Sequence, residues 1–388
     1  MPRTESHDCY AVTPPGIEAL AARELSLMGV APGAVAPGGV SFRATPCGIA
    51  RANIELRSAS RVLVRVATFH ASAFHELERR TARLPWETYV APGRAVSFRV
   101  TSHKSKLYHQ DAIAQRLASA VARRVPGAIA AAGPAIADDP EATEPPSAQL
   151  FVVRLFRDEC TVSADASGAH LHQRGYRLAT AKAPMRETLA AAMLLAVGWD
   201  GSAPLVDPLC GAGTIPIEAA LLARRIAPGL GRGFACEQWP GFDAGSWPAL
   251  REKARSRVLP RARVRILGSD RDAGAIEAST DNARRAGVLE DVEFRRAALS
   301  VLAPPGGPGV VITNPPYGVR VGRSGDLRDL YAQLGHTLRR RCAGWRVAFL
   351  SARHELAAQT RFDLQTVLRT TNGGIRVKLL EATVPPPA

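Results

Sequence analysis

The stretch DPLCGAGT, residues 207–214, decides the fold class of the second half of this chain. It follows a short apolar run, Ala203 to Val206, that predicts a buried strand, and it precedes a helical pattern from Ile215 to Arg225. A strand, a glycine-containing turn and a helix in this order are typical of a nucleotide site in an open α/β sheet. Gly211 and Gly213 let the backbone approach a ligand, and the start of the helix offers unpaired N–H groups.

The class of ligand follows from what this turn lacks. A dinucleotide fingerprint needs a third glycine where the chain has Pro216, and a phosphate loop needs a Gly-Lys-Ser/Thr sequence that the turn does not contain. S-adenosylmethionine carries a sulfonium and an ammonium group in place of phosphates, so a carboxylate at the strand end suits its methionine part. We therefore predict an S-adenosylmethionine site that includes Asp207, Pro208, Cys210, Gly211, Gly213 and Thr214.

Two later strand ends extend this predicted cofactor site. The run Val264 to Leu267 leads to Asp270 and Arg271, and an acidic residue at that position can accept both hydroxyls of a ribose. The run Val292 to Phe294 leads to Ala298, where methyltransferases often place an Asp that binds the adenine amine. No Asp is present there, so adenine recognition is expected to rest on backbone groups and apolar contacts near Ala298.

An insertion separates the first two of these strands. Asp207 and Asp270 are 63 residues apart (270 − 207), whereas a minimal unit has about 20 residues between the equivalent positions. Residues 227–250 supply the extra length, with four large aromatic residues among glycines and prolines: Phe234, Trp239, Phe242 and Trp247. We expect these aromatic residues to form a local core, and direct contact with the substrate is the less favoured alternative.

The second motif is NPPYG, residues 314–318, which follows the β-branched run Val310 to Ile312. The Asn314 amide oxygen and the Pro315 carbonyl, fixed by Pro315 and Pro316, are two acceptors for the two N–H groups of an exocyclic base amine. Tyr317 offers a ring on which a flipped base can stack. These four residues are the predicted catalytic residues. The alternative is that the motif is only a rigid turn.

The chemistry predicted for this motif is in-line transfer of a sulfonium methyl to the amine nitrogen. Accepting the two N–H hydrogens favours a pyramidal nitrogen with its lone pair directed at the methyl carbon, and fixed geometry lowers the entropic part of the barrier. No strong base is needed, because the nitrogen is acidic after transfer. Guanine and adenine both carry such an amine, so the motif leaves the base open.

Four segments together resemble the THUMP-containing rRNA guanine-N2 methyltransferases. They are QRGYR at 173–177, APMRETLA at 183–190, DPLCGAGT and NPPYG, in the same order and spacing. The resemblance covers nearly the whole chain. It implies a Rossmann-like class I methyltransferase domain preceded by α+β ferredoxin-like and THUMP modules, and methylation of N2 of a guanine in large-subunit (23S) rRNA. It also implies that the segment from Ala183 to Thr188 helps to line the methionine part of the cofactor pocket.

The domain boundaries expected from this organisation are 1–66 for the ferredoxin-like segment, 67–166 for the THUMP RNA-binding domain, 167–186 for a linker and 187–388 for the methyltransferase domain. Within the linker, Arg174 and Arg177 flank an aromatic residue, and with the resemblance this predicts RNA contacts. Lys104 and Lys106 precede a helical pattern and are candidates for phosphate contacts, although a solvated helix entry explains them equally well. Residues 126–148 are expected to form a surface excursion without fixed structure.

Composition agrees with an RNA partner. The chain has 388 residues, a formal net charge of +15 and a sequence pI near 10.3, which favour a polyanionic partner. The six cysteines have no paired spacing, which predicts neither a metal site nor a disulfide framework and fits the reducing cytoplasm. No apolar stretch is long enough to span a membrane. Three alternatives stay open: a tRNA guanine-N2 enzyme, an adenine-N6 enzyme, and a non-catalytic RNA-binding or ribosome assembly factor.

Overall fold

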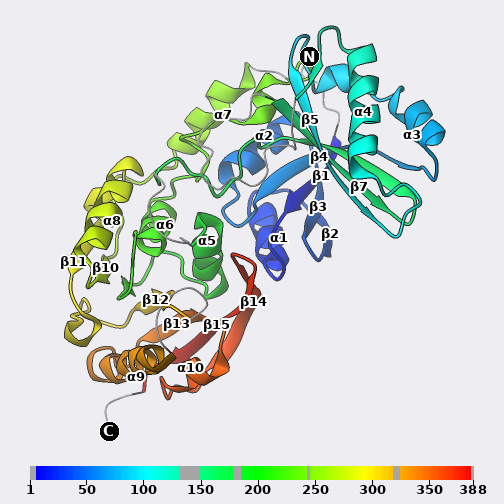
Figure 1. Cartoon of the computed structure of the whole chain (residues 1–388). Coiled ribbons are helices and arrows are strands. Elements are labelled where there is room, and N and C mark those ends of the chain that lie inside the picture. The colour runs from blue at the N-terminus through cyan, green and yellow to red at the C-terminus, as the bar shows by residue number, and fades with distance from the viewer. Residues whose placement is uncertain (1–5, 132–147, 178–184, 243–244, 318–323, 386–388) are drawn as a thin grey trace. The chain divides into compact units, whose positions relative to one another are not determined.

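Two compact units make up the chain (Figure 1). The structure, a computed structural model, describes residues 6–131, 148–177, 185–242, 245–317 and 324–385. Unit 1 contains Met1–Thr13, Ala21–Gln173 and Gly231–Lys253, and unit 2 contains Pro14–Leu20, Arg174–Leu230 and Ala254–Ala388. Each unit therefore includes a segment that lies, in sequence, within the other.

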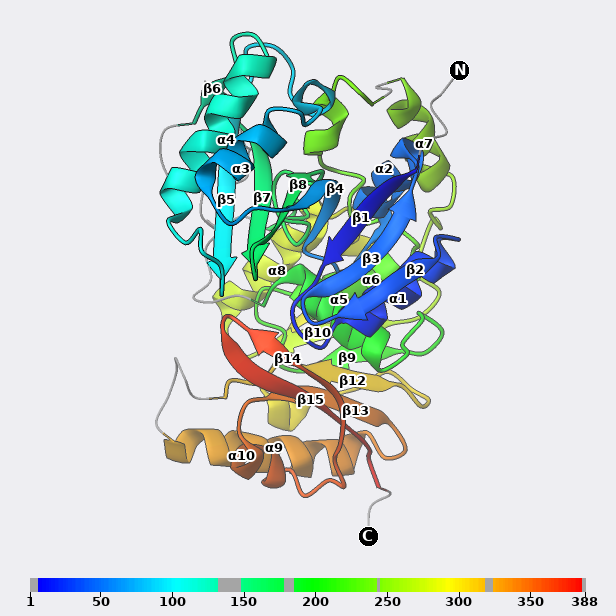
Figure 2. The ribbon, with the colours of Figure 1, turned by 90° about the vertical axis from the view of Figure 1, so that its right-hand side faces the viewer.

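Unit 1 is built on an eight-stranded sheet with the order β2-β3-β1-β4-β8-β7-β5-β6, which can be followed from right to left in Figure 2. Its strands are β1 (His7–Val12), β2 (Pro32–Ala36), β3 (Gly39–Ala44), β4 (Arg61–His70), β5 (Ala95–His103), β6 (Ile129–Ala130), β7 (Ala148–Phe156) and β8 (Glu159–Asp165). The pairs β5–β7 and β5–β6 are parallel, and the other pairs are antiparallel.

The helices of unit 1 accompany these strands. They are α2 (Pro46–Glu55), α3 (Phe74–Thr81), α4 (Gln110–Arg124), most of α1 (Glu18–Leu27) and most of α7 (Ser246–Arg255), with the short 3-10 helices η1 (Trp86–Thr88) and η2 (Ala235–Gln238). The helix α2 shows how local sequence sets a boundary. Thr45 caps its start by accepting a hydrogen bond from the Gly48 N–H at 3.3 Å, and Pro46 at the first helical position loses no helix hydrogen bond.

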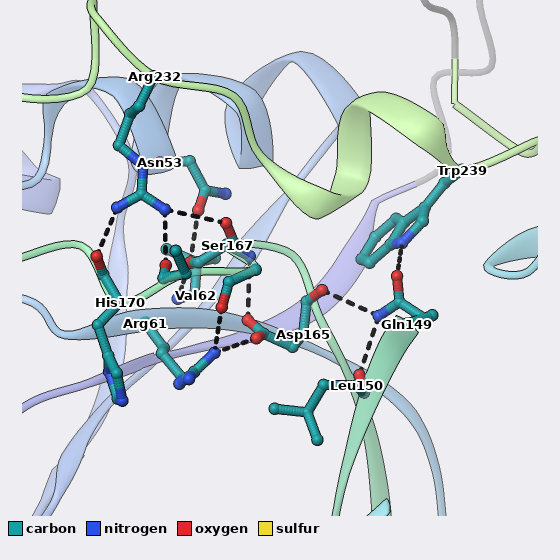
Figure 3. A network of polar contacts seen from close by, with 12 residues as sticks. Asn53, Arg61, Val62, Gln149, Leu150, Asp165, Ser167, His170, Arg232 and Trp239 are labelled. Carbon is teal, nitrogen blue, oxygen red and sulfur yellow. Dashed lines mark hydrogen bonds and ion pairs between the residues drawn. The ribbon is translucent and has the colours of Figure 1, made fainter. Parts of the chain in front are cut away.

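Residues 231–253 are part of unit 1 through a network of polar contacts (Figure 3). The Arg232 guanidinium donates to the carbonyl oxygens of Ser167 (3.3 Å), Ala169 (2.6 Å), His170 and Gln173 (3.2 Å). These carbonyls belong to the chain that follows β8, so one arginine holds the end of that segment.

The buried aromatic residues of the insertion pack into the same unit. The Trp239 indole N–H donates to the Gln149 side-chain oxygen at 2.7 Å, and the Trp239 ring meets Tyr89 edge-on at 5.0 Å between centroids. Phe242 stacks on His7 at 5.6 Å. The expected local core is therefore too narrow an interpretation, because these rings also join the core around β7 and η1.

Unit 2 is built on a seven-stranded sheet with the order β11-β10-β9-β12-β13-β15-β14. Its strands are β9 (Leu205–Asp207), β10 (Ile266–Asp270), β11 (Val292–Arg296), β12 (Val310–Thr313), β13 (Arg346–Ser351), β14 (Gln365–Asn372) and β15 (Ile375–Thr383). The first five are parallel in the sheet, and β15 pairs antiparallel with both β13 and β14.

Helices cover both faces of this sheet. The helices and short turns of unit 2 are α5 (Glu187–Ala196), α6 (Thr214–Ala223), α8 (Ala273–Arg285), η3 (Leu289–Asp291), η4 (Leu299–Val301), α9 (Ser324–Arg341) and α10 (His354–Ala358). Alternate strand residues fall into two separate apolar cores: Val310 and Ile312 pack with α5, α6 and α8, whereas Val311 packs with α9 and α10. Unit 2 therefore has the expected Rossmann-like α/β fold, with helices packed on both faces of its sheet.

A tight turn joins the last two strands of unit 2. The antiparallel hairpin β14–β15 pairs Asn372 with Ile375, and its two turn residues, Gly373 and Gly374, have φ angles of 56° and 82°. Both angles lie in the left-handed region that two-residue hairpin turns require, which explains why two glycines stand there. The glycine pair therefore fixes the register of this edge of the sheet.

The boundaries of the two compact units differ from the expected domain boundaries. The strand β4 runs across the expected boundary at 66/67, and its pairing with β8 joins both front modules in one sheet. The expected linker divides between Gln173 and Arg174, and residues 231–253 of the expected methyltransferase domain belong to unit 1. Residues 132–147 of the expected surface excursion lie outside the described residues.

Candidate functional site

The candidate site lies in unit 2 where the strand order of the sheet reverses. The strand β9 has β10 on one side and β12 on the other, and all three are parallel, so their carboxyl ends meet at one edge. Ligands in open α/β sheets bind at such a point. Asp207, Asp270 and Thr313 are the last residues of β9, β10 and β12, which places both predicted motifs at this edge.

A direct hydrogen bond joins the two motifs. The buried Thr313 hydroxyl donates to the Asp207 carboxylate at 2.7 Å, and the Leu209 N–H donates to the same oxygen at 3.2 Å. Burial, together with the charge of Asp270, raises the pKa of Asp207 to about 7, although these two hydrogen bonds act in the opposite direction. Thr313 precedes Asn314 directly, so the hydroxyl fixes the start of NPPY against the cofactor turn.

The turn after β9 has the glycine conformations that its sequence predicts. Gly211 and Gly213 have φ angles of 51° and 80°, and both lie in the left-handed region. A Cβ at Gly211 would meet nothing within 4 Å, so this side of the turn is open to a ligand. A Cβ at Gly213 would lie 2.8 Å from the Ser279 Cβ and 3.1 Å from the Phe294 ring, so the second glycine is needed for packing.

Asp270 has a role that the sequence did not reveal. One carboxylate oxygen accepts the Gly211 N–H at 3.0 Å, and the other accepts the Asp272 N–H at 3.0 Å. The residue therefore supports the cofactor turn as well as facing the same edge. Each oxygen retains a second lone pair, so the expected contact with ribose hydroxyls stays compatible with these bonds.

The remaining predicted cofactor residues lie around the same edge. The Ala297 N–H donates to the Asp270 carbonyl at 2.9 Å, which brings the segment at Ala298 beside β10. Both Ala298 and Arg271 are exposed, Cys210 is buried, and Thr214 begins α6. The expected cofactor residues thus converge on one edge.

Asn314 has a buried side-chain oxygen, Oδ1, that accepts no hydrogen bond from the described part of the chain. A buried acceptor without a donor is costly, so in the native protein it needs a partner such as a water molecule or a ligand. Pro315 is buried and Pro316 exposed. The Tyr317 hydroxyl accepts a hydrogen bond from the Asn372 side-chain amide at 2.6 Å, so the end of β14 positions the predicted stacking ring. Gly318 lies outside the described residues.

Arg174 and Arg177 are placed differently from the RNA contacts expected of them. The Arg174 side chain is 3% exposed and lies 3.6 Å from the Glu218 carboxylate, which also accepts the Tyr176 hydroxyl at 3.2 Å. The Arg177 guanidinium donates to the Thr214 hydroxyl at 2.8 Å and pairs with Glu187 at 3.3 Å. Both guanidinium groups lie against carboxylates inside the fold and not at an exposed surface that RNA could contact. Arg177 also binds Thr214, at the end of the predicted cofactor turn.

Glu187 is a further residue that sequence reasoning did not single out, although it stands in the quoted segment at 183–190. Its side chain is buried, and burial raises its pKa to about 7 against the lowering effect of the Arg177 charge. Asn282 was also missed: its side-chain amide donates to the Ala212 carbonyl at 3.0 Å and braces the cofactor turn from α8. Neither has a motif of its own, because each acts through a tertiary contact.

Lys104 and Lys106 lie in unit 1, in the loop between β5 and α4, and both are exposed. The loop is held by the Asp158 carboxylate, which accepts the Lys106 N–H at 2.7 Å, and by the Ser105 hydroxyl, which accepts the Asp158 N–H at 3.0 Å. Lys104 has a φ angle of 53°, in the left-handed region. These hydrogen bonds hold the loop in one conformation, with both lysines at the surface.

Two findings concern metal sites and membrane-spanning helices. Among the described residues, no cluster of three or more His, Cys, Asp or Glu side chains could hold a metal ion. No described helix is long and apolar enough to cross a membrane.

At the β9–β10–β12 edge, the polar groups available to a ligand are two carboxylates, backbone N–H groups and an amide oxygen. This set suits an organic cation with hydroxyl groups.

Comparison with known families agrees with this geometry. A family model described as the RMKL-like methyltransferase domain matches residues 174–377, which include both motifs and the whole β9–β12 edge. This chain belongs to the RMKL-like methyltransferase family. A second model, described as the RlmL ferredoxin-like domain, matches residues 8–63 and covers β1 to the start of β4. The order β2-β3-β1-β4 within the unit 1 sheet is the strand order of that fold.

Two curated relatives of this RMKL-like chain show how far the similarity extends. A Synechocystis protein named as an RNA methyltransferase is 32% identical over 375 residues, which are 96% of this chain and 95% of the relative. A ribosomal RNA large subunit methyltransferase K/L of Syntrophotalea carbinolica is 36% identical over 388 residues. The match covers 96% of this chain and 53% of that protein, so the chain spans about half the length of its K/L relative.

Two solved structures resemble the RMKL-like chain over its full length. One, named as a methyltransferase and solved in complex with SAH, has a TM-score of 0.85 at 30% identity and covers 98% of both chains. The other, a Listeria monocytogenes protein named as a predicted N6-adenine-specific DNA methylase, has a TM-score of 0.84 at 32% identity and covers 98% of this chain and 97% of its own. The expected class I methyltransferase fold is confirmed.

Proposed function

We propose that this chain transfers a methyl group from S-adenosylmethionine to the exocyclic N2 of a guanine in large-subunit rRNA. The observation that carries the proposal is the buried Asn314 Oδ1, which accepts no hydrogen bond from the described residues. It stands one residue after Thr313, whose hydroxyl is bonded to Asp207 in the cofactor turn. An acceptor for an amine N–H therefore lies beside the predicted methyl donor site.

The residues of the β9–β10 edge suit this cofactor. S-adenosylmethionine, when bound, supplies an electrophilic methyl group on a sulfonium. Asp207 and Asp270 place two carboxyl groups at the edge, and the first gains from a neighbouring cation because its pKa is raised to about 7 by burial. Gly211 leaves room for the ligand, and Asp270 retains lone pairs for the ribose hydroxyls. The solved relative with bound SAH supports this assignment.

Asn314, Pro315 and Tyr317 are proposed to act on the substrate base. The Asn314 Oδ1 and the Pro315 carbonyl each accept one N–H of the amine, and the Tyr317 ring, held by Asn372, stacks on the flipped base. With S-adenosylmethionine bound, these contacts would direct the amine lone pair at the methyl carbon that the cofactor supplies, and its sulfur would keep the electron pair of the broken bond. The cationic nitrogen loses a proton to water, which needs no protein base. Fixed geometry supplies much of the rate enhancement.

The substrate assignment rests on the relatives. The K/L relative is named for large-subunit ribosomal RNA, and the Synechocystis relative for RNA. The net charge of +15 supports a polyanionic partner. One observation favours a second candidate, transfer to adenine N6: the Listeria structure carries a name for that reaction on DNA. The two candidates share every proposed contact at Asn314 and differ in the base.

Nucleoside mass spectrometry separates these candidates. The protein is incubated with isotope-labelled S-adenosylmethionine and, in separate tubes, with unmodified large-subunit rRNA, tRNA and DNA. The proposal predicts labelled N2-methylguanosine from rRNA. The same product from tRNA alone would change the assigned substrate from rRNA to tRNA. Labelled N6-methyladenine would change the assigned base from guanine to adenine. No label in any tube, with intact cofactor binding, would favour a non-catalytic RNA-binding role.

A further inference from the structure

One face of the unit 1 sheet is lined by exposed side chains. Along β7, Phe151, Val153 and Leu155 are fully buried, whereas the alternate residues Arg154 and Phe156 are exposed. Successive strand residues point to opposite faces, so Arg154 and Phe156 share the face that the buried residues leave. We call it the open face.

The same face continues across four strands. Strand register places Arg154 opposite Thr161 of β8 and Arg65 of β4 opposite Ser163 of β8. Leu63, which shares the parity of Arg65, lies opposite Tyr10 of β1. Arg65 is exposed and Tyr10 is partly exposed. The open face therefore extends from β7 to β1, with Ser163 and Leu63 buried between its exposed residues.

Aromatic rings and arginines are paired on this face. The Arg65 guanidinium lies 5.4 Å from the centre of the Tyr10 ring. The Phe156 ring has Arg154 at 5.8 Å, Arg157 at 5.2 Å and the His103 ring stacked on it at 5.8 Å. Each exposed ring thus has a cation beside it, and Arg65 and Arg154 have no carboxylate partner in the described part of the chain.

Two hollows lie along the open face. One, of about 660 Å³, is lined by Tyr10, Leu63, Arg65, Val152 and Arg154, among others. A neighbouring hollow of about 630 Å³ shares Arg65 and also contains Asp8 and Arg43, which pair at 3.4 Å. Both volumes fall in the range of about 300–1,000 Å³ of sites for small molecules. Apart from the Asp8–Arg43 pair, the charged residues that line the two hollows in the described part of the chain are Arg65 and Arg154.

We infer that the open face binds a single-stranded segment of the RNA substrate, with bases stacked on Tyr10 and Phe156 and phosphates at Arg65 and Arg154. This inference rests on the proposed function for its choice of RNA. Exposed rings at the surface of a β-sheet stack on unpaired bases, and a duplex hides the faces of its bases. Each ring with an arginine beside it offers one surface for a base and one cation for a phosphate, which is the pairing that a single strand needs. The exposed Lys104 follows His103 at the end of β5 and extends the cationic line.

Binding measurements on the full chain test this inference. The probes are a short single-stranded oligoribonucleotide, a duplex RNA and a DNA strand of the same sequence, and the readout is affinity over a range of salt concentrations. The variants are Phe156→Ala and Arg154→Ala. Phe156→Tyr keeps the ring. Arg79→Ala, at an exposed arginine in the last turn of α3, is the charge-matched control.

The two variants are expected to differ in their salt dependence. Phe156→Ala should weaken single-strand binding about tenfold without changing the slope of log affinity against log salt, because it removes one stacked base. Arg154→Ala should reduce that slope by about 0.7, the value for one phosphate contact on a single strand. Phe156→Tyr and Arg79→Ala should bind like the unsubstituted protein, and all variants should keep its thermal unfolding midpoint.

Unchanged single-strand affinity and slope in both variants, with folding intact, would overturn the inference. Equal affinity of the unsubstituted protein for duplex and single-stranded RNA would also overturn it. A preference for the DNA strand would overturn the choice of RNA as the ligand of this face. Failure of the proposed function appears separately, as the absence of N2-methylguanosine in the nucleoside assay while these binding differences persist.

Discussion

At the scale of single residues, one hydrogen bond organises the site. The Thr313 hydroxyl meets the Asp207 carboxylate at 2.7 Å, in surroundings where both residues are buried. A buried carboxylate without a cation nearby is costly to ionise, which is why burial raises the pKa of Asp207 to about 7. In the proposed function, the bound S-adenosylmethionine cation relieves that cost, so the raised pKa should link cofactor binding to pH.

The first prediction concerns this link. The folded pKa of Asp207, about 7, lies above its ordinary value of 3.8, so below about pH 7 the carboxyl group must lose a proton when a cation binds. Affinity for S-adenosylmethionine should therefore fall up to about tenfold per pH unit below 7 and stay level above it. Asp207→Asn should bind more weakly at pH 8 and show no such slope. Calorimetric titration between pH 5.5 and 8.5 checks both; equal slopes in the two proteins would contradict the assignment.

At the scale of elements, the turn between β9 and α6 depends on two glycines for different reasons. A Cβ at Gly211 would face open space, whereas a Cβ at Gly213 would lie 2.8 Å from the Ser279 Cβ of α8 and 3.1 Å from the Phe294 ring of β11. The first glycine keeps room for the ligand. The second keeps α6 close to the sheet, so that the N-terminus of α6 stays at the edge where the two motifs meet.

The second prediction compares alanine at these two glycines. Gly211→Ala should lower the free energy of unfolding by about 1–2 kcal/mol, the cost of a left-handed residue with a Cβ. Gly213→Ala should cost about 2–5 kcal/mol, because steric overlap is added to the same conformational cost. Urea denaturation of the cofactor-free proteins measures the difference. A Gly213→Ala variant as stable as Gly211→Ala would show that the turn and α8 are less tightly packed than described.

At the scale of the whole molecule, the chain leaves each compact unit and returns to it. Residues 231–253 follow β9 and α6 of unit 2 in sequence, yet they complete unit 1. Arg232 donates to four carbonyls of the chain after β8, and Trp239 reaches Gln149. Unit 1 is therefore complete only when residues far along the chain have been made.

The third prediction tests this dependence. Arg232→Ala removes a donor from four carbonyls, of which the His170 carbonyl still accepts the Gln173 N–H, and should lower the stability of unit 1 by about 2–4 kcal/mol. Amide hydrogen exchange should accelerate in residues 166–173 and 231–242, while β9, β10 and β12 keep their protection. Arg261→Ala, at an exposed ion pair with Glu290, is the control and should change stability by less than about 1 kcal/mol. Unchanged exchange in Arg232→Ala would mean that the insertion is held by its aromatic residues alone.

The sequence was sufficient for features that local pattern controls. The strand–turn–helix at 203–225 follows from periodicity and backbone conformation, and the structure confirms it. It was not sufficient for features that depend on partners distant in the chain. Arg174 and Arg177 look like RNA contacts as isolated cations, but Glu218 and Glu187 pair with them in the fold.

The insertion was misjudged for the same physical reason. A cluster of aromatic residues predicts a buried core, yet the pattern does not say which core the rings join, and Tyr89 and His7 are more than 140 residues earlier. The Thr313–Asp207 bond was within reach of sequence reasoning, because both residues end parallel strands that meet at one edge. The supporting bond from Asp270 to the Gly211 N–H required the three-dimensional turn.

The measurement that tests the central claim most directly is the single-turnover rate of methyl transfer to large-subunit rRNA by Asn314→Ala. If Asn314 Oδ1 accepts the amine N–H in the transition state, the rate should fall at least about 100-fold, as on loss of a positioned hydrogen-bonding group, while affinity for S-adenosylmethionine changes less than about threefold. A variant that folds, binds the cofactor and transfers the methyl group at a rate near that of the unsubstituted protein would contradict the account.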